Sequence, residues 1–181
     1  IKEAKRRFTY TPRMFGYQQL IFRPELSRTM DGQTFVQSVH LDEPSSMVLF
    51  CSPWQQNLLN RPRLVQELYF DGTFDSAPKG IEQVVTLLIR ESPTANAVPV
   101  MFAWLWDKKT ISYDFFFENV RRLAPDLIQC QTLIVHTDFE KGMHNAIQNM
   151  LEPRRKETFK LLIVGCWFHL KAAITRWIGK K

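Results

Sequence analysis

The stretches Phe70-Asp71-Gly72-Thr73-Phe74 and Thr137-Asp138-Phe139-Glu140 are the most informative parts of this sequence. Each places an aspartate, Asp71 or Asp138, at or just past the end of an apolar, β-prone run. Side chains at the ends of neighbouring strands meet at one edge of a sheet, so we expect the two carboxylates to converge. Paired carboxylates of this kind hold divalent cations in metal-dependent phosphoryl transfer.

The composition indicates a globular domain. The 181 residues are 45% hydrophobic and 13% aromatic, which is enough for a sizeable core. A formal net charge of +6 is compatible with a polyanionic partner. The three cysteines are widely spaced, which favours a reducing compartment over a disulfide framework. No apolar run reaches membrane-spanning length, so we expect no membrane partner.

Around the first motif the pattern predicts a meander of strands. The extended segments are residues 67–74, 81–90 and 98–107. Their short polar connections favour antiparallel neighbours. A strand at 47–51 and a helix starting near Pro53 precede them, since proline suits the first helical turn.

The second half alternates helices with strands. Helical spacing predicts a buried stripe formed by Tyr113, Phe116, Phe117, Val120 and Leu123. A strand at 133–135, buried on both faces, leads into the second motif. A second helix places Met143, Ile147, Met150 and Leu151 on one side. After a strand at 161–164, the last helix repeats the stripe with Trp167, Leu170, Ile174, Trp177 and Ile178. The order β-β-β-α-β-α-β-α predicts an α/β fold with a mixed sheet and helices on its faces.

Residues 1–46 are expected to form an N-terminal extension, or a linker to an upstream module, and residues 47–181 a domain. The first segment carries a basic cluster, scattered proline and glycine, and a turn signal at Asp31-Gly32. Because the sequence stops just after a strongly patterned helix, we expect it to be a piece of a longer protein.

Four motifs in order make the sequence resemble the Mutator-like element (MULE) transposase domain, from about Met47 to Trp177. They are Asp71-Gly72-Thr73-Phe74 with Ala77-Pro78 after it, Val98-Pro99-Val100, Thr137-Asp138-Phe139-Glu140, and Gly165-Cys166-Trp167-Phe168-His169-Leu170. The resemblance implies a ribonuclease-H-like fold whose first and fourth strands lie side by side and carry the first two catalytic carboxylates. It also implies a DDE-type enzyme that cuts and rejoins DNA in the nucleus and works as a homo-oligomer.

For the active site, the resemblance implies that Asp71 bridges two Mg²⁺ or Mn²⁺ ions and that Asp138 is the second ligand. Carboxylate oxygens are hard ligands that suit these ions. The third acid of this family is a glutamate on a later helix. Glu152 and Glu157 come too early for it, so we expect it beyond Lys181. The chain is then truncated before its last catalytic helix and inactive alone.

Simpler interpretations of these motifs stay open. Asp71-Gly72 is also a hairpin turn signal. Thr137 and Glu140 match a capping box, in which both side chains bond free amides at a helix start while Asp138 remains available to metal. Glu140 is thus a candidate for supporting Asp138, and His136 either tunes Asp138 or packs in the sheet.

Cys166 and His169 have the spacing of half a zinc site. A structural zinc needs four ligands, and no second pair stands out among the other cysteines and histidines. The alternative for Cys166 is burial as a small apolar group. The MULE family has a Cys-x-x-His motif at this place, so the pair is kept as a candidate site of unresolved role, with zinc one candidate.

Basic side chains provide candidate DNA contacts, or simply a solvated surface. The candidates are Arg154, Arg155, Lys156, Lys171 and Arg176. Three functions therefore compete: a transposase core, a non-catalytic DNA-binding or transcription-regulatory descendant, and another nuclease of the same fold. The presence of both Asp71 and Asp138 favours the first over the second. The Cys-x-x-His motif and the Asp-Gly-Thr-Phe context argue against the third.

Overall fold

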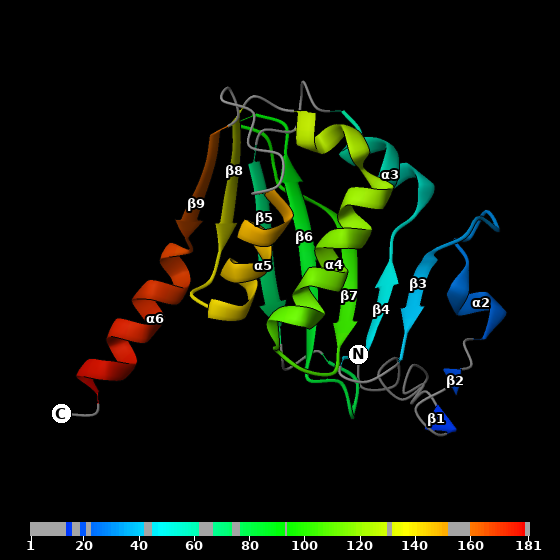
Figure 1. Ribbon diagram of the computed structural model, residues 1–181, viewed down its shortest axis with the longest axis horizontal. Helices are drawn as coiled ribbons and strands as arrows, with labels where there is room; N and C mark the ends of the chain where they lie inside the picture. The colour runs from blue at the N-terminus through cyan, green and yellow to red at the C-terminus, as the bar shows by residue number, and fades with distance from the viewer. Residues whose placement is uncertain are drawn as a thin grey trace.

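A mixed seven-stranded sheet, in the order β3-β4-β7-β6-β5-β8-β9, forms the centre of the molecule (Figure 1). The computed structural model describes residues 14–15, 19–20, 23–41, 45–61, 67–73, 77–92, 94–129, 132–151 and 160–179. The sheet strands are β3 (Val36–His40), β4 (Met47–Phe50), β5 (Glu67–Thr73), β6 (Gln83–Arg90), β7 (Val98–Leu105), β8 (Thr132–Thr137) and β9 (Lys160–Gly165). Two short strands, β1 (Met14–Phe15) and β2 (Gln19–Leu20), pair separately.

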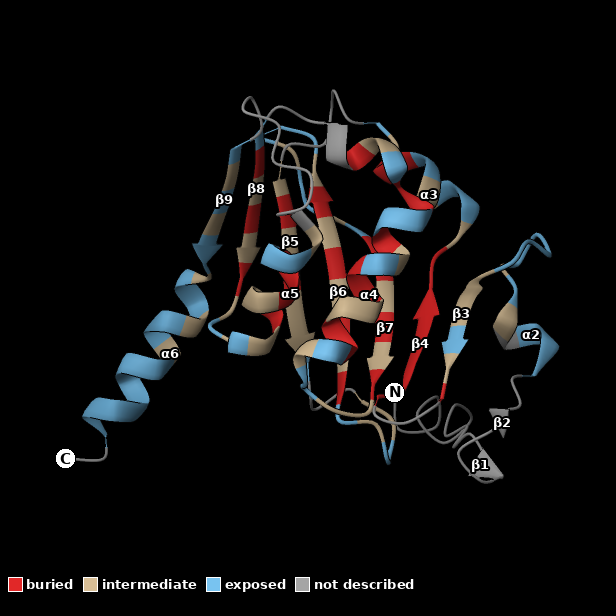
Figure 2. Cartoon of the chain, in the orientation of Figure 1, coloured by how far each residue is buried: buried red, intermediate tan, exposed pale blue. Residues whose placement is uncertain are grey.

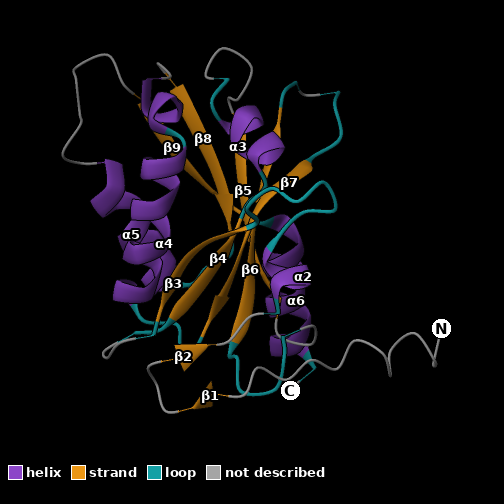
Figure 3. Cartoon of the chain, turned by 90° about the vertical axis from the view of Figure 1, so that its right-hand side faces the viewer, coloured by secondary structure: helices purple, strands orange, loops and turns teal. Residues whose placement is uncertain are grey.

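Helices lie on both sides of this sheet, which confirms the predicted α/β class. They are α2 (Pro24–Ser27), α3 (Pro53–Leu59), α4 (Thr110–Leu123), α5 (Lys141–Leu151) and α6 (Trp167–Ile178), with a 3₁₀ turn η2 (Pro125–Gln129). Figure 3 shows α4 and α5 together on one side, and α6 on the other. Among the described residues, no helix combines the length and the apolar character needed to cross a membrane.

The predicted antiparallel meander is confirmed, because β5 pairs antiparallel with β6 and β6 with β7. Asp71 pairs with Thr86, and Gly72 pairs with Val85. Both residues of the Asp-Gly motif therefore lie inside a strand. The hairpin-turn interpretation of this motif is wrong, since the strand continues to Thr73 before the chain turns.

Parallel pairing begins after the meander. The chain returns through α4 to β8, which pairs parallel with β5, and through α5 to β9, which pairs parallel with β8. Helical crossovers are what parallel neighbours require. β8 is fully buried on one face only, where Leu133 and Val135 lie, whereas Ile134 and His136 on the other face are half-buried. The prediction of burial on both faces is therefore wrong.

The main core fills the space between the sheet and helices α3, α4 and α5 (Figure 2). The apolar stripe predicted for α4 is confirmed as buried, and so are Met143 and Ile147 of α5. Alternation along β6 sends Val85, Leu87 and Ile89 into this core. Burying each such side chain stabilises the fold by roughly 1.5–3 kcal/mol.

Helix α6 differs from the other long helices. Its predicted apolar stripe exists, but Trp167 is 71% exposed and Trp177 is 62% exposed. No residue of this helix is buried (Figure 2). Periodicity shows that a helix has an apolar face, but it does not show what covers that face. The neighbouring strand β9 is at the edge of the sheet and leaves Leu162 exposed as well.

Candidate functional site

Asp71 lies on β5, and Asp138 is the residue that follows the end of the neighbouring parallel strand β8. In the β5–β8 pairing Tyr69 faces His136, and each aspartate comes two residues later along the chain, so the register, continued by two residues, places them at the same level. Adjacent strands are about 4.8 Å apart, so the two carboxylates start from neighbouring backbone positions. Asp71 points away from the main core, because its neighbour Phe70 is buried there, and its side chain is 50% exposed.

The loop after β8 holds Asp138 through its backbone and its carboxylate. The Glu140 amide donates to Asp138 Oδ1 (3.0 Å), and His144 Nε2 lies 2.7 Å from the Asp138 carbonyl oxygen. The Thr137 hydroxyl turns inward and donates to Met143 Sδ (2.9 Å). The predicted capping box is therefore not formed, since the Thr137 side chain is engaged in the core. Glu140 contacts Asp138 only through its backbone amide, while its carboxylate turns to other partners.

A buried polar network fixes Glu140. The Tyr113 hydroxyl of α4 donates to Glu140 Oε2, and Lys108 Nζ lies 3.5 Å from Glu140 Oε1. Gln83 of β6 donates its side-chain amide to the Tyr113 hydroxyl oxygen. Burial, together with the bond to Glu140, raises the pKa of Tyr113 well above its ordinary value. A Cβ at Gly72 would come within 2.8 Å of Gln83 Oε1, so this glycine leaves room for the network.

The Cys-x-x-His motif lies beside the aspartates. Cys166 precedes α6 as its N-cap residue, and its amide donates to the carbonyl of Thr137 (2.7 Å), the last residue of β8. In the first turn of α6, His169 Nε2 lies 3.9 Å from Asp71 Oδ1. The spacing of the motif alone did not reveal this contact. Cys166 is a free thiol and only half-buried, so the prediction of its burial is not met.

A second polar cluster lies on the same side of the sheet as Asp71. Glu67 accepts hydrogen bonds from the Tyr69 hydroxyl and the Arg90 guanidinium, which together hold the pKa of its carboxyl below the ordinary value. Burial, with the bond to Glu67, raises the pKa of Tyr69 to about 12. His136 stacks on Tyr69 with ring centroids 4.3 Å apart, and its Nε2 lies 3.5 Å from Glu67 Oε2. These contacts match the packing role considered for His136.

The candidate DNA contacts are only partly placed. Lys171 and Arg176 lie exposed on α6. Arg154, Arg155 and Lys156 lie outside the described residues. Of the five candidate DNA contacts, the described residues therefore include only the two on α6.

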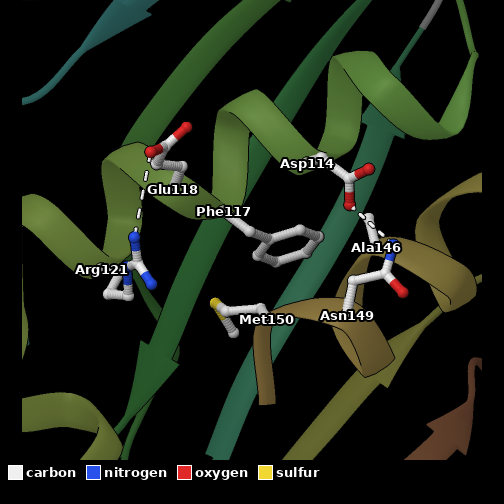
Figure 4. A pocket seen from close by; sticks show the side chains of 7 residues that line it. All are labelled: Asp114, Phe117, Glu118, Arg121, Ala146, Asn149 and Met150. Carbon is white, nitrogen blue, oxygen red and sulfur yellow. Dashed lines mark hydrogen bonds and ion pairs between the residues drawn. The ribbon is translucent and has the colours of Figure 1, made fainter. Parts of the chain in front are cut away.

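A groove of about 230 Å³ lies between α4 and α5, on the other side of the sheet (Figure 4). Its lining residues are Asp114, Phe117, Glu118, Arg121, Ala146, Asn149 and Met150. An Asn149–Asp114 hydrogen bond of 3.2 Å spans the two helices. No candidate site residue lines this groove, so it is separate from the aspartates.

Sequence reasoning missed the supporting residues Lys108, Tyr113 and Gln83. Tyr113 looked like one more member of an apolar stripe, and only its hydroxyl signalled a partner. Gln83 carried a clearer signal, because it is polar at a position of β6 that alternation assigns to the core. Contacts between residues so far apart in sequence become visible only once the sheet order is known.

The carboxylate oxygens of the two aspartates are suitable ligands for a hard divalent cation. Two carboxylates at neighbouring strand positions provide oxygen ligands, which Mg²⁺ and Mn²⁺ prefer. Within the described ranges, no group of three or more His, Cys, Asp or Glu side chains is arranged to hold a metal ion. Comparisons with protein-family models, curated proteins and solved structures found no match to this chain.

Proposed function

We propose that this chain carries part of the catalytic core of a metal-dependent DNA transposase of the DDE type, similar to the Mutator-like family. The observation that carries the proposal is the parallel register of β5 and β8, in which Tyr69 faces His136 and Asp71 and Asp138 each follow two residues later, Asp138 just past the end of β8. In the order of the chain, these are the first and fourth strands from the meander onward. A ribonuclease-H-like core places its first two catalytic acids on strands with this relationship.

Sheet order and direction also support a ribonuclease-H-like core. The strands β7-β6-β5 are antiparallel, and β5-β8-β9 are parallel. With α4 and α5 as crossovers, their order along the chain is β-β-β-α-β-α-β, which is the order that this proposal requires. In this proposal β3 and β4 extend the sheet beyond β7.

The chain's own residues would hold and orient the reacting groups. Asp71 reaches solvent from inside a strand, where its backbone is fixed by pairing with Thr86. Asp138 is held by the Glu140 amide. Two divalent cations bound there would activate the attacking oxygen and stabilise the leaving oxygen of a phosphodiester. A third carboxylate, outside the described residues, completes the ligand set in this proposal.

Calorimetric titration with Mn²⁺ tests the metal site. We expect weak binding that Asp71→Asn abolishes, because the amide loses the negative charge and one oxygen ligand. Asp114→Asn is the matched control, since Asp114 lies on α4 in the groove on the other side of the sheet and should leave binding unchanged. Unaltered binding in the Asp71→Asn variant, or no binding in the parent protein, would contradict the proposal.

The Mn²⁺ titration, together with a measurement of DNA binding, distinguishes the transposase from the non-catalytic alternative. A chain that binds DNA but not Mn²⁺ would be a DNA-binding or transcription-regulatory derivative of a transposase. DNA binding is measured by fluorescence anisotropy of a labelled duplex at several salt concentrations, because phosphate contacts weaken as salt rises.

A further inference from the structure

His169 is brought to Asp71 by the way α6 starts. The Cys166 amide bonds the carbonyl of Thr137, which ties the beginning of α6 to the end of β8. Three residues later, within the first helical turn, His169 faces the carboxylate of Asp71. The position of this imidazole therefore follows from the backbone join between β8 and α6.

The gap between the two side chains is informative. His169 Nε2 and Asp71 Oδ1 are 3.9 Å apart, which is longer than a hydrogen bond between nitrogen and oxygen. An ion held about 2.1 Å from each of two ligand atoms, at an angle of about 90–110°, places those atoms about 3.0–3.4 Å apart. The two atoms would therefore have to approach each other by about 0.5–0.9 Å to bind one cation.

The two ring nitrogens of His169 have different surroundings. Nδ1 is buried and has no hydrogen-bond partner among the described residues. The side chain as a whole is 31% exposed, and its Nε2 atom faces Asp71. In the tautomer with its proton on Nδ1, the ring offers the Nε2 lone pair to a cation, so Nε2, which faces Asp71, is the candidate ligand atom.

From this geometry we propose that His169 Nε2 and Asp71 Oδ1 are two ligands of one divalent cation. The inference rests on the proposed function in taking Asp71 as a metal ligand, and it adds a nitrogen donor beside that carboxylate. A mixed nitrogen–oxygen pair favours Co²⁺ or Zn²⁺ over Mn²⁺, and favours Mg²⁺ least. In this assignment Cys166 acts through its backbone and is not a ligand, so the Cys-x-x-His motif is not half of a structural zinc site.

Pulsed electron paramagnetic resonance on the Mn²⁺-loaded protein gives a direct readout, because a coordinated imidazole couples ¹⁴N to the metal spin. We expect a nitrogen coupling in the parent protein that changes to the ¹⁵N pattern when histidine is labelled with ¹⁵N. His169→Gln should remove the coupling. His40→Gln is the matched control and should keep it, since His40 packs on Phe115 away from the aspartates.

Co²⁺ titration tests the same ligand through its contribution to the binding affinity. His169→Gln should weaken Co²⁺ binding at least about tenfold, because even outer partners of metal ligands contribute about 10- to 100-fold. The loss for Mg²⁺ should be smaller, since this ion prefers oxygen. Cys166→Ser should leave Co²⁺ affinity unchanged if the thiol is not a ligand.

The outcomes separate this inference from the proposed function. Metal binding that needs Asp71 but shows no nitrogen coupling in the parent protein would overturn the role of His169 and leave the transposase proposal standing. Loss of Co²⁺ affinity in Cys166→Ser as well as His169→Gln would replace the assignment with a thiol–imidazole site. If none of Mn²⁺, Co²⁺ and Mg²⁺ binds to the parent protein, both proposals are overturned. The labelled parent protein decides the question even if a variant fails to fold.

Discussion

At the residue scale, Tyr113 supports Asp138 without touching it. Its hydroxyl connects Gln83 of β6 with Glu140, whose amide in turn donates to Asp138. The chain from β6 to Asp138 is continuous and mostly buried. Such a network is stabilising when every member has its partners, and costly when one partner is removed.

Tyr113→Phe should therefore lower the free energy of unfolding by about 1–3 kcal/mol, because Glu140 and Gln83 each lose a partner while the ring keeps its packing. Urea denaturation measures this loss. In a Glu140→Gln background the same change should cost less, since the two residues interact directly. Equal losses in both backgrounds would show that the hydroxyl does not support Glu140.

Glu67 makes stability depend on pH. Its pKa is lowered in the folded protein from an ordinary value of 4.5, chiefly by the hydrogen bond from Tyr69 and also by Arg90. The stabilisation that ionised Glu67 contributes is therefore fully present above the pKa of this carboxyl in the unfolded chain. It is lost as the pH falls through the pKa of the same carboxyl in the folded protein.

Glu67→Gln should reduce the free energy of unfolding by about 1–3 kcal/mol at pH 7, since hydrogen bonds to a charged group are stronger than those to a neutral one. Below pH 4.5 the difference between parent and variant should narrow, because protonated Glu67 resembles glutamine. Urea denaturation from pH 3 to pH 7 tests this. A difference that stays constant over the range would contradict an electrostatic role.

At the element scale, the sequence predicted the stripe of α4 and the start of α3 well. Both depend on local spacing and capping: Ser52 and Gln55 form a capping box at the start of α3, beside Pro53. The contact between Tyr113 and Glu140 could not be predicted from the sequence, because it joins residues 27 positions apart through tertiary packing. The two aspartates could be named from their motifs, whereas their supporting shell could not.

Helix α6 illustrates the same limit. Spacing revealed its apolar stripe, but neither the exposure of that stripe nor the contact of His169 with Asp71 is encoded in periodicity. Both follow from where β9 lies in the sheet and from the join between Cys166 and β8. The contact with Asp71 is thus made by the first turn of this helix, while its later turns carry exposed aromatic and basic side chains.

If α6 contacts DNA, Lys171→Gln with Arg176→Gln should weaken binding and make it less dependent on salt. Each lost phosphate contact reduces the slope of log K against log salt concentration by about 0.9. Fluorescence anisotropy with a labelled duplex measures the slope. Arg121→Gln with Arg122→Gln removes the same charge from α4, on the other side of the sheet, and should have a smaller effect. Similar effects of the two pairs would indicate a general charge effect.

At the scale of the whole molecule, the buried core and the candidate site are carried by different parts. The core lies between strands β4 to β8 and helices α3, α4 and α5. The aspartates lie at the carboxyl ends of β5 and β8, and Asp71 points to the opposite face. Helix α6 contributes His169 to that face but no buried side chain.

A chain that ends at Gly165 should therefore still fold. Its free energy of unfolding should stay within about 1 kcal/mol of the parent, because substitutions and losses at exposed positions have small effects. A chain that ends at Leu151 is the matched control. It also lacks β9, whose Leu161 and Ile163 pack against the core and whose backbone pairs with β8, so it should unfold or lose cooperativity. Urea denaturation followed by circular dichroism distinguishes the two chains. A cooperative transition in the second chain but not in the first would contradict this division. The expected pattern would show that the sheet folds without α6.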